Sequence, residues 1–318
     1  MKIGYALSVE QFSPEELLDQ ARRARDAGFE SLAISDHFHP WNEAQGNSAF
    51  VWSMIGALSQ ATPELPLSTL VTCPIIRINP VILAQAAATA SLLLEGRFTF
   101  GVGTGENLNE HVWGAPWPPA KERLERLREA VELMRLLWTG HNIDFQGQFY
   151  RAVNARLYSL PDEPPMVYVS GLGPRSTELA TEIADGFVTF SRESLEQYRG
   201  GGGAGEAQTS LKVCFDVDEA LAIGTIHRLW ATELNPGQLN RELAQPNDIE
   251  SAASLVTPEM VAAKFTCGAD PDRHIAALQC RIDDGFDEIF VQQVGDDFDG
   301  FFETYRTEVL PQLRRGPK

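Results

Sequence analysis

The stretch that decides the fold class is Leu32-Ala33-Ile34-Ser35-Asp36-His37-Phe38-His39-Pro40-Trp41. Its apolar start follows the helix-stop residue Gly28 and predicts a short buried strand. In parallel α/β proteins, ligands bind at the carboxyl ends of strands, where these polar side chains would lie. His37 is therefore a candidate general base, Asp36 an orienting partner or ligand acceptor, and Trp41 a wall for a ring. The structural alternative is that Asp36 caps the next segment, that His37 is a hydrogen-bonded core residue, and that Trp41 only packs against its neighbours.

A second polar cluster follows the strand-like run Arg97-Phe98-Thr99-Phe100. It is the stretch Gly101-Val102-Gly103-Thr104-Gly105-Glu106-Asn107-Leu108-Asn109-Glu110. Alternating glycines let a backbone approach a ligand closely and present free N–H groups. A carboxyl such as Glu106 beside this glycine floor suits hydrogen bonding or proton transfer to a heterocyclic ring. The run lacks the spacing of a dinucleotide fingerprint, and a plain tight turn is the alternative.

The length and composition favour one large α/β domain. The 318 residues match an α/β barrel with insertions, and a hydrophobic fraction of 43% supports a large core. The net charge of −18, from 44 acids and 26 bases, argues against a broad surface for nucleic acid or anionic membrane. The longest apolar stretches, such as 81–94, are too short and too polar to span a bilayer.

The cysteines and the N-terminus predict a cytoplasmic protein without a metal site. The chain begins with a strand-like segment, Met1-Lys2-Ile3-Gly4-Tyr5, that lacks the apolar core of a signal peptide. No Cys-x-x-Cys pair and no metal-ligand spacing occurs. The four cysteines are Cys73, Cys214, Cys267 and Cys280.

Strand-like and helix-like segments alternate along the chain. Ser13-Pro14-Glu15-Glu16 is a capping box that starts a helix, and 121–138 is the clearest amphipathic helix. The expected strands are 1–5, 32–34, 67–71, 97–100, 166–169, 186–190, 212–215 and 288–291, and the expected helices 14–27, 51–58, 80–96, 121–138, 174–179, 274–282 and 301–313. About eight βα units predict a TIM (β/α)8 barrel, with a doubly wound sheet as the alternative. A hairpin insertion is expected at 142–160 and a polar insertion at 230–257.

With both clusters at predicted strand ends, the chain resembles the luciferase-like (bacterial luciferase) superfamily. Within it, the chain is most similar to the oxidoreductases related to glucose-6-phosphate dehydrogenase that use the deazaflavin coenzyme F420. The similarity covers essentially the whole chain and rests on four segments in order, 35–41, 77–80, 103–110 and 168–174. The resemblance implies one luciferase-like barrel domain over 1–318, coenzyme F420 as cofactor with FMN as the alternative, and a homodimer.

The resemblance also implies roles for individual residues. His37 would accept the substrate hydroxyl proton while hydride passes to ring carbon C5, and Trp41 would wall the reacting face. Glu106 would serve proton exchange at ring N1 or at the reacting substrate. Asp36 would contact the ring system, and Leu70-Val71 would form a bulge behind it, often through a non-proline cis peptide in this family. The other residues expected along the ring and its ribityl-phosphate tail are Thr104, Gly105, Asn109, Ser170, Gly171, Leu172 and Gly173, with core packing as the alternative for Val71 and Leu172.

The sequence departs from the sugar-phosphate branch of this family in the expected substrate pocket. Glu193 and Ser251 stand where two phosphate-binding lysines would be, and an acid repels a phosphate. Arg192, Arg273 and Arg281 are the candidates that would compensate. The predicted activity is hydride transfer between F420 and a small alcohol, carbonyl, imine or activated alkene rather than a sugar phosphate. The alternatives are an FMN-dependent luciferase-like monooxygenase and a non-catalytic flavin-binding protein.

Overall fold

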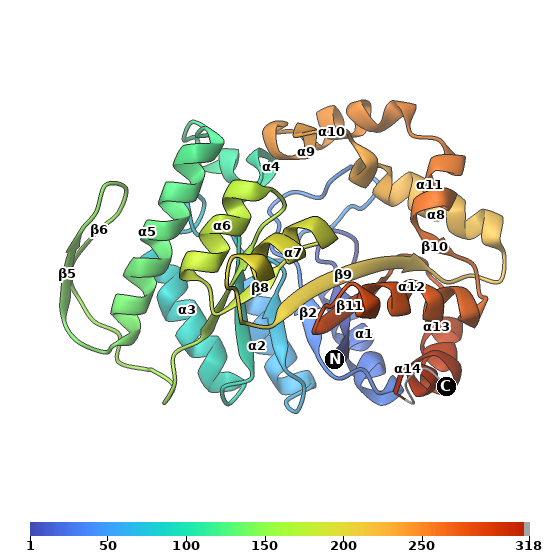
Figure 1. The fold of residues 1–318 in the computed structure, drawn as a ribbon, viewed down its shortest axis with the longest axis horizontal. Coiled ribbons are helices and arrows are strands. Elements are labelled where there is room, and N and C mark those ends of the chain that lie inside the picture. Colours follow the sequence, from blue (N-terminus) through green and yellow to red (C-terminus); the bar gives the residue numbers. More distant parts are fainter. Residues whose placement is uncertain (315–318) are drawn as a thin grey trace.

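The computed structural model describes residues 1–314, in which eight parallel strands close into a barrel (Figure 1). In their order around the barrel, the strands are β1 (Lys2–Leu7), β2 (Leu32–Ile34), β3 (Leu67–Thr69), β4 (Phe98–Val102), β7 (Met166–Ser170), β8 (Gly186–Val188), β9 (Ala207–Cys214) and β11 (Glu288–Gln293). The pairings of β11 with β1 and of β8 with β9 complete the circle. The predicted TIM (β/α)8 barrel is therefore confirmed, because a doubly wound sheet would leave two edge strands unpaired.

Helices cover the outside of the barrel and connect its strands (Figure 1). The predicted capping box is present in α1 (Pro14–Ala27): Glu16 N–H donates to Ser13 Oγ, and the Glu16 carboxylate accepts from Ser13 N–H. Gly28 ends this helix with φ 93°, a left-handed conformation that favours glycine. The other barrel helices are α2 (Val51–Ala61), α3 (Pro80–Leu93), α5 (Ala120–Trp138), α6 (Pro174–Ile183), α7 (Arg192–Gly200), α12 (Pro271–Asp283) and α13 (Phe298–Thr304).

Several elements differ from the sequence-based expectation, among them the twelve-residue helix α8 (Glu219–Trp230), which was not predicted. The short helix α7 was not predicted. Its N-cap is Ser191, whose side chain accepts from Ser194 N–H, and nine residues show too little periodicity to reveal it. Strand β9 begins at Ala207 instead of 212, because its buried polar residues Gln208 and Thr209 obscure the apolar pattern. The last predicted helix is interrupted by a π-helical turn, Tyr305–Val309, between α13 and α14 (Leu310–Arg314).

Two additional segments extend the barrel. Strands β5 (Ile143–Gln146) and β6 (Arg151–Ala155) form a separate antiparallel hairpin at the left of Figure 1. Beyond β9, the helices form an arc at the upper right of the same view. They are α8 (Glu219–Trp230), α9 (Leu239–Glu242), α10 (Pro246–Ala252) and α11 (Pro258–Lys264), followed by β10 (Thr266–Cys267), which pairs with β9. None of the helices in residues 1–314 is long and apolar enough to cross a membrane.

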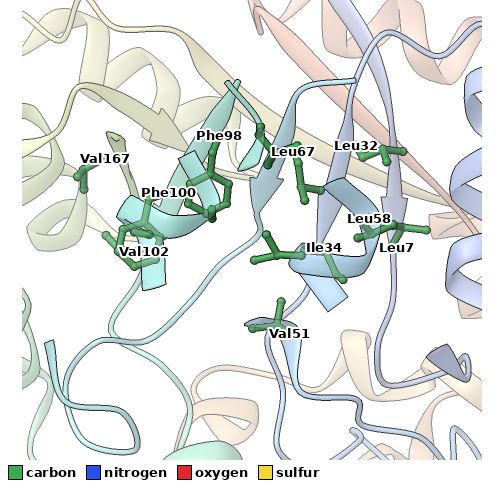
Figure 2. Packing of buried hydrophobic residues seen from close by; sticks show 14 of the residues in the cluster. Leu7, Leu32, Ile34, Val51, Leu58, Leu67, Phe98, Phe100, Val102 and Val167 are labelled. Atoms are coloured by element: carbon green, nitrogen blue, oxygen red, sulfur yellow. The ribbon is translucent and has the colours of Figure 1, made fainter. Parts of the chain in front are cut away.

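The main core lies between the barrel strands and the helices. Figure 2 shows side chains of β1 to β4 and β7 packing together with Val51 and Leu58 of α2. The barrel interior is filled differently, by a small cluster around Phe290 that includes Ala6 and Ala33. A Cβ on Gly4 would lie 2.5 Å from the Phe290 ring, so glycine leaves room for this ring inside the barrel. The filled interior leaves the rim formed by the carboxyl ends of the strands as the place for a site.

Candidate active site

His37 leaves the end of β2 and meets a carboxylate from the end of β1. Its Nε2 lies 3.3 Å from Oε1 of Glu10, and their side chains are 10% and 3% exposed. The hydroxyls of Ser8 and Ser35 donate to the Glu10 carboxylate. Burial alone would raise the pKa of Glu10, but the attraction of His37 and the two serine hydrogen bonds hold it below its ordinary value. A buried carboxylate is thus kept charged beside the histidine.

Asn109 connects the His37 loop to the loop after β4. Its Oδ1 accepts hydrogen bonds from the backbone N–H of Phe38 and His39, at 2.8 and 3.2 Å. Its Nδ2 then faces the imidazole and lies 3.2 Å from His37 Nδ1. The same Nδ1 lies 3.0 Å from the carbonyl oxygen of His39. Both sides of the imidazole are therefore oriented by fixed partners.

Trp41 stands beside His37. The two ring centroids are 4.9 Å apart, with an angle of 57° between the planes. The Trp41 backbone N–H donates to Gln45, and Gln45 in turn donates to the carbonyl of Leu229 at the end of α8. The indole also packs against the apolar cluster that contains Trp230. The arc of helices beyond β9 therefore supports the aromatic wall of the site.

The glycines at the end of β4 and just after it provide a floor on which neighbouring segments pack closely. A Cβ on Gly101 would lie 2.0 Å from the carbonyl oxygen of Thr69, which only glycine tolerates. A Cβ on Gly103 would lie 2.9 Å from the Val71 side chain and 3.6 Å from Ser170 Cβ. The peptide bond between Leu70 and Val71 is cis. Three predicted site segments, after β3, β4 and β7, therefore meet at Gly103.

Gly105 and Glu106 begin the turn into the short helix α4 (Asn107–Glu110). Gly105 has φ +69°, and a Cβ there would lie 2.4 Å from Cys73 Sγ, so the loop packs directly on this buried thiol. Burial raises the pKa of the Cys73 thiol well above its ordinary value, which keeps it protonated and chemically inert. Glu106 is half-buried at the N-cap position, where its side chain makes no capping hydrogen bond.

Asp36 is held by an ion pair that the sequence did not predict. Its Oδ1 accepts from Arg77 Nη2 at 2.7 Å, and Arg77 Nε lies 3.6 Å from Oε1 of Glu110. The backbone N–H of Arg77 also donates to Glu110 Oε2 at 2.7 Å. The second oxygen of Asp36, Oδ2, is buried without a protein hydrogen bond in the described structure. This oxygen is an acceptor available to a bound ligand.

The remaining predicted residues lie farther along the rim. Gly171 is buried, and a Cβ at this position would lie 2.8 Å from the Phe187 ring of β8. Leu172 is 40% exposed, and Gly173 is the N-cap of α6, where a Cβ would meet open space. None of their described hydrogen bonds reaches the His37 cluster. These three residues therefore form a separate segment beyond β7 and Ser170.

The substrate-pocket residues considered from the sequence are exposed, and the arginines are already paired. Glu193 lies in the first turn of α7, and Ser251 lies in α10 with its hydroxyl donating to the Asn247 carbonyl. Each arginine proposed to compensate faces a carboxylate: Arg192 with Glu196 and Asp284, Arg273 with Glu219, and Arg281 with Asp284. These pairings do not support the compensating role.

Sequence reasoning missed Glu10, Arg77 and Glu110 as parts of this site. Glu10 follows a strand end in the stretch Ser8-Val9-Glu10, which is the same signal that identified Asp36 and His37. This strand-end position marks Glu10 as a further candidate in the sequence. Arg77 and Glu110 lie within two of the four segments that carry the family resemblance, but their pairing depends on how two loops meet in space. Among the described residues, no group of three or more His, Cys, Asp or Glu side chains could hold a metal ion.

Comparison with known proteins identifies the family. The model of the luciferase-like monooxygenase family matches residues 1–288. Two relatives named F420-dependent glucose-6-phosphate dehydrogenase, from Nocardia farcinica and Intrasporangium calvum, are 35% and 36% identical, with 99% of this chain covered and 98% and 99% of theirs. The chain therefore belongs to the luciferase-like family, as the sequence motifs predicted, and groups with its F420-dependent dehydrogenases.

A solved structure agrees with this placement. The F420-dependent secondary alcohol dehydrogenase in complex with an F420–acetone adduct is 30% identical, with a TM-score of 0.92 over 98% of this chain and 99% of that one. Two features of the site suit a bound aromatic ring that carries polar groups. Asp36 Oδ2 is a buried acceptor without a protein hydrogen bond in the described part of the chain, and the Trp41 ring lies 4.9 Å from the His37 ring.

The contact between Gly105 and Cys73 generates a stability prediction. Gly105→Ala should destabilise the protein by about 1–2 kcal/mol for the left-handed backbone and by about 1–3 kcal/mol more for the clash with Cys73. Gly114→Ala is the matched control, because Gly114 has φ +78° and open space around its Cβ. Urea unfolding of both variants measures the difference. Equal losses would show that Cys73 does not restrict this loop.

Proposed function

We propose that this chain transfers hydride between coenzyme F420 and a small uncharged alcohol or carbonyl compound. The F420-dependent oxidoreductase class rests on the relatives and the solved structure named above. The single observation that carries the reaction type is the Glu10–His37 pair next to Trp41 at the rim. A non-catalytic flavin-binding protein has no need for a buried proton carrier paired with a carboxylate.

His37 is proposed as the general base toward a substrate hydroxyl. When Nδ1–H donates to the His39 carbonyl, Nε2 is the ring atom that takes up a proton. The Glu10 carboxylate at 3.3 Å stabilises the imidazolium that forms. In the reverse direction, the same Nε2–H returns the proton to a carbonyl oxygen. Glu10 holds the charge of the imidazolium, and Asn109 holds the His37 loop through the backbone N–H groups of Phe38 and His39.

The other predicted residues are assigned supporting roles. Bound F420 supplies a ring carbon, C5, that accepts or donates hydride. Glu106 carries a half-buried carboxyl at the edge of the glycine floor and is proposed to exchange a proton there or at the substrate. Asp36, through its free Oδ2, and Thr104, Gly105 and Asn109 are proposed to hold the ring. The segment from Ser170 to Gly173 is proposed for the phosphate tail, and Leu70-Val71 for the ring's rear face.

An uncharged substrate is supported by the state of Lys212, whose ammonium lies over Trp230 in the cluster against which Trp41 packs. Lys212 of β9 pairs with Glu233 at 2.8 Å, and its ammonium lies 4.4 Å above the Trp230 ring. Trp230 in turn donates to Gln11, the neighbour of Glu10. Glu233 thereby neutralises the charge of Lys212, so this ammonium is not free to bind a substrate phosphate. The rival substrate is glucose 6-phosphate, named for the two relatives.

We further propose a homodimer, formed through the apolar face of α2 and α3. No charged residue occurs in α3, whereas a helix facing water normally carries charges on its outer face. Ile82 is 57% exposed and Leu93 44% exposed, beside a hollow that also includes Trp52 and Gly56. A second copy of this chain would bury this patch.

Sedimentation velocity should show that the parent chain is a dimer and that Ile82→Asp dissociates it. Val153→Asp, on the β6 hairpin strand, is the control and should leave the dimer intact. A monomeric parent chain would contradict this.

A reducing compartment, the cytoplasm, is proposed as the site of action. All four cysteines are free, and Cys280 is exposed. Exposed free thiols suit compartments in which thiols stay reduced.

The cofactor and the base are tested together. Fluorescence titration should show tighter binding of F420 than of FMN, which separates this proposal from an FMN-dependent monooxygenase. His37→Ala should bind F420 almost as the parent does but turn over roughly 10²- to 10⁴-fold more slowly, the usual contribution of general acid–base catalysis. His141→Ala, on the exposed turn before β5, is the control. Equal or tighter FMN binding would reject the cofactor, and unchanged turnover in His37→Ala would reject the base.

The substrate proposal predicts a preference that one substitution should alter. The parent enzyme should oxidise 2-propanol with a higher kcat/KM than glucose 6-phosphate. Glu233→Gln frees the Lys212 ammonium, so it should raise kcat/KM for glucose 6-phosphate by roughly 10-fold, the value of one charge-assisted hydrogen bond, and leave 2-propanol nearly unchanged. Efficient oxidation of glucose 6-phosphate by the parent enzyme would overturn the preference for uncharged substrates.

A further inference from the structure

Three loops of the site converge on one buried arginine. Arg77 comes from the segment after β3, Asp36 from the loop after β2, and Glu110 from α4 after β4. Their side chains are 8%, 0% and 0% exposed. The guanidinium pairs with Asp36 at 2.7 Å, and the Arg77 backbone N–H donates to Glu110 at 2.7 Å. One residue thus contacts both of the other loops by side chain and backbone.

The charges of this triad do not balance when all three groups are ionised. Two carboxylates face one guanidinium in a site closed to water, which leaves a net negative charge that is costly to bury. Burial raises the pKa of Glu110 to about 7, and nearby Asp36 and Glu106 act in the same direction, while Arg77 opposes them. The Cys73 thiol also lies near Glu110, and burial raises its pKa well above the ordinary value, so it is neutral. Glu110 is therefore the member that holds a proton near neutrality.

The triad is directly connected to the catalytic loop. Asp36 immediately precedes His37, and Asn109 immediately precedes Glu110. Asn109 accepts from the N–H groups of Phe38 and His39 and places its amide nitrogen 3.2 Å from His37. Because Arg77 holds a neighbour of His37 and a neighbour of Asn109, displacement of the guanidinium moves both partners of that contact.

We propose that Arg77 is a positioning residue that aligns His37 with Asn109 through Asp36 and Glu110, and that Glu110 is the proton-exchanging member of this triad. The inference rests on the proposed function for its effect on F420 and turnover. Its effect on the geometry of the protein alone is independent of the cofactor. Arg77 does not touch the reacting atoms and acts only through the two loops.

The first test uses the protein without cofactor. Arg77→Lys keeps the charge but cannot reach both carboxylates, so the imidazole NMR signals of His37, assigned by comparison with His37→Gln, should shift. Arg306→Met removes an arginine that pairs with Glu303 on the surface, and it should leave those signals in place. Arg77→Met is included as the stronger change. If it fails to fold, Arg77→Lys still decides the question.

The second test concerns the proton on Glu110. A carboxyl with a raised pKa in the folded state loses stabilisation as the pH rises from about 4.5 to about 7, because only the folded protein still holds the proton. Glu110→Gln mimics the protonated form. Its melting temperature relative to the parent should therefore increase over this range. Parallel curves for the two proteins would show that Glu110 does not exchange a proton there.

The third test connects the triad to function. Arg77→Lys should weaken F420 binding and lower kcat by roughly 10- to 100-fold, the loss expected from a small misplacement of catalytic groups, and Glu110→Gln should flatten the pH profile of kcat/KM near neutrality. Arg77→Lys and Glu110→Gln could lower the melting temperature but leave the His37 signals, the F420 affinity and the pH profile unchanged. That result would show that Arg77 has only a structural role. Failure of the parent protein to bind F420 would reject the proposed function, while the first two tests would still decide the triad.

Discussion

The site depends on the hydrogen bonds that close the barrel between β11 and β1. The direct pairing of β1 with β2 brings Glu10 to His37, and the pairing of β1 with β11 closes the barrel on the other side of β1. Closure also lets the side-chain amide of Gln11 donate to the carbonyl of Val294, just beyond β11, while its oxygen accepts from Trp230. In an open sheet, β1 and β11 could end at opposite edges, and the wall around His37 would lose one side.

Close backbone approach is the second requirement. Gly101 and Gly103 allow the segments after β3 and β7 to pack against β4, and Gly105 allows the next turn to rest on Cys73. Side chains at these positions would separate the loops that carry Asp36, Arg77 and Asn109. The glycines therefore act on the electrostatics of the site indirectly, because the ion pairs form only when these loops are close.

Charged side chains at this rim occur in pairs. Glu10 pairs with His37, Asp36 and Glu110 share Arg77, and Lys212 pairs with Glu233. Each pairing lowers the cost of removing a charge from water, and each also fixes a loop relative to its neighbour. The same pairings explain why a count of basic residues in the sequence is a poor guide to phosphate binding: Arg192, Arg273 and Arg281 all face carboxylates.

Local patterns in the sequence were sufficient for the barrel, the capping box of α1 and the strand-end positions of Asp36, His37 and the glycine run. They were insufficient for α7, which is too short to show helical periodicity, and for the start of β9, whose inward-facing residues are polar. Glu10 shows an intermediate case. Its strand-end position was visible in the sequence, but its pairing with His37 was not.

The sequence by itself determined which residues end strands, which turns require glycine and which helices begin at caps, because these properties depend on a few consecutive residues. Only the tertiary structure decided that Arg77 joins Asp36 to Glu110, that Asn109 orients His37 and that Glu233 neutralises Lys212. Those contacts connect residues far apart in the chain. They form only when barrel closure and strand register bring separate loops within hydrogen-bonding distance, and no local pattern encodes that distance.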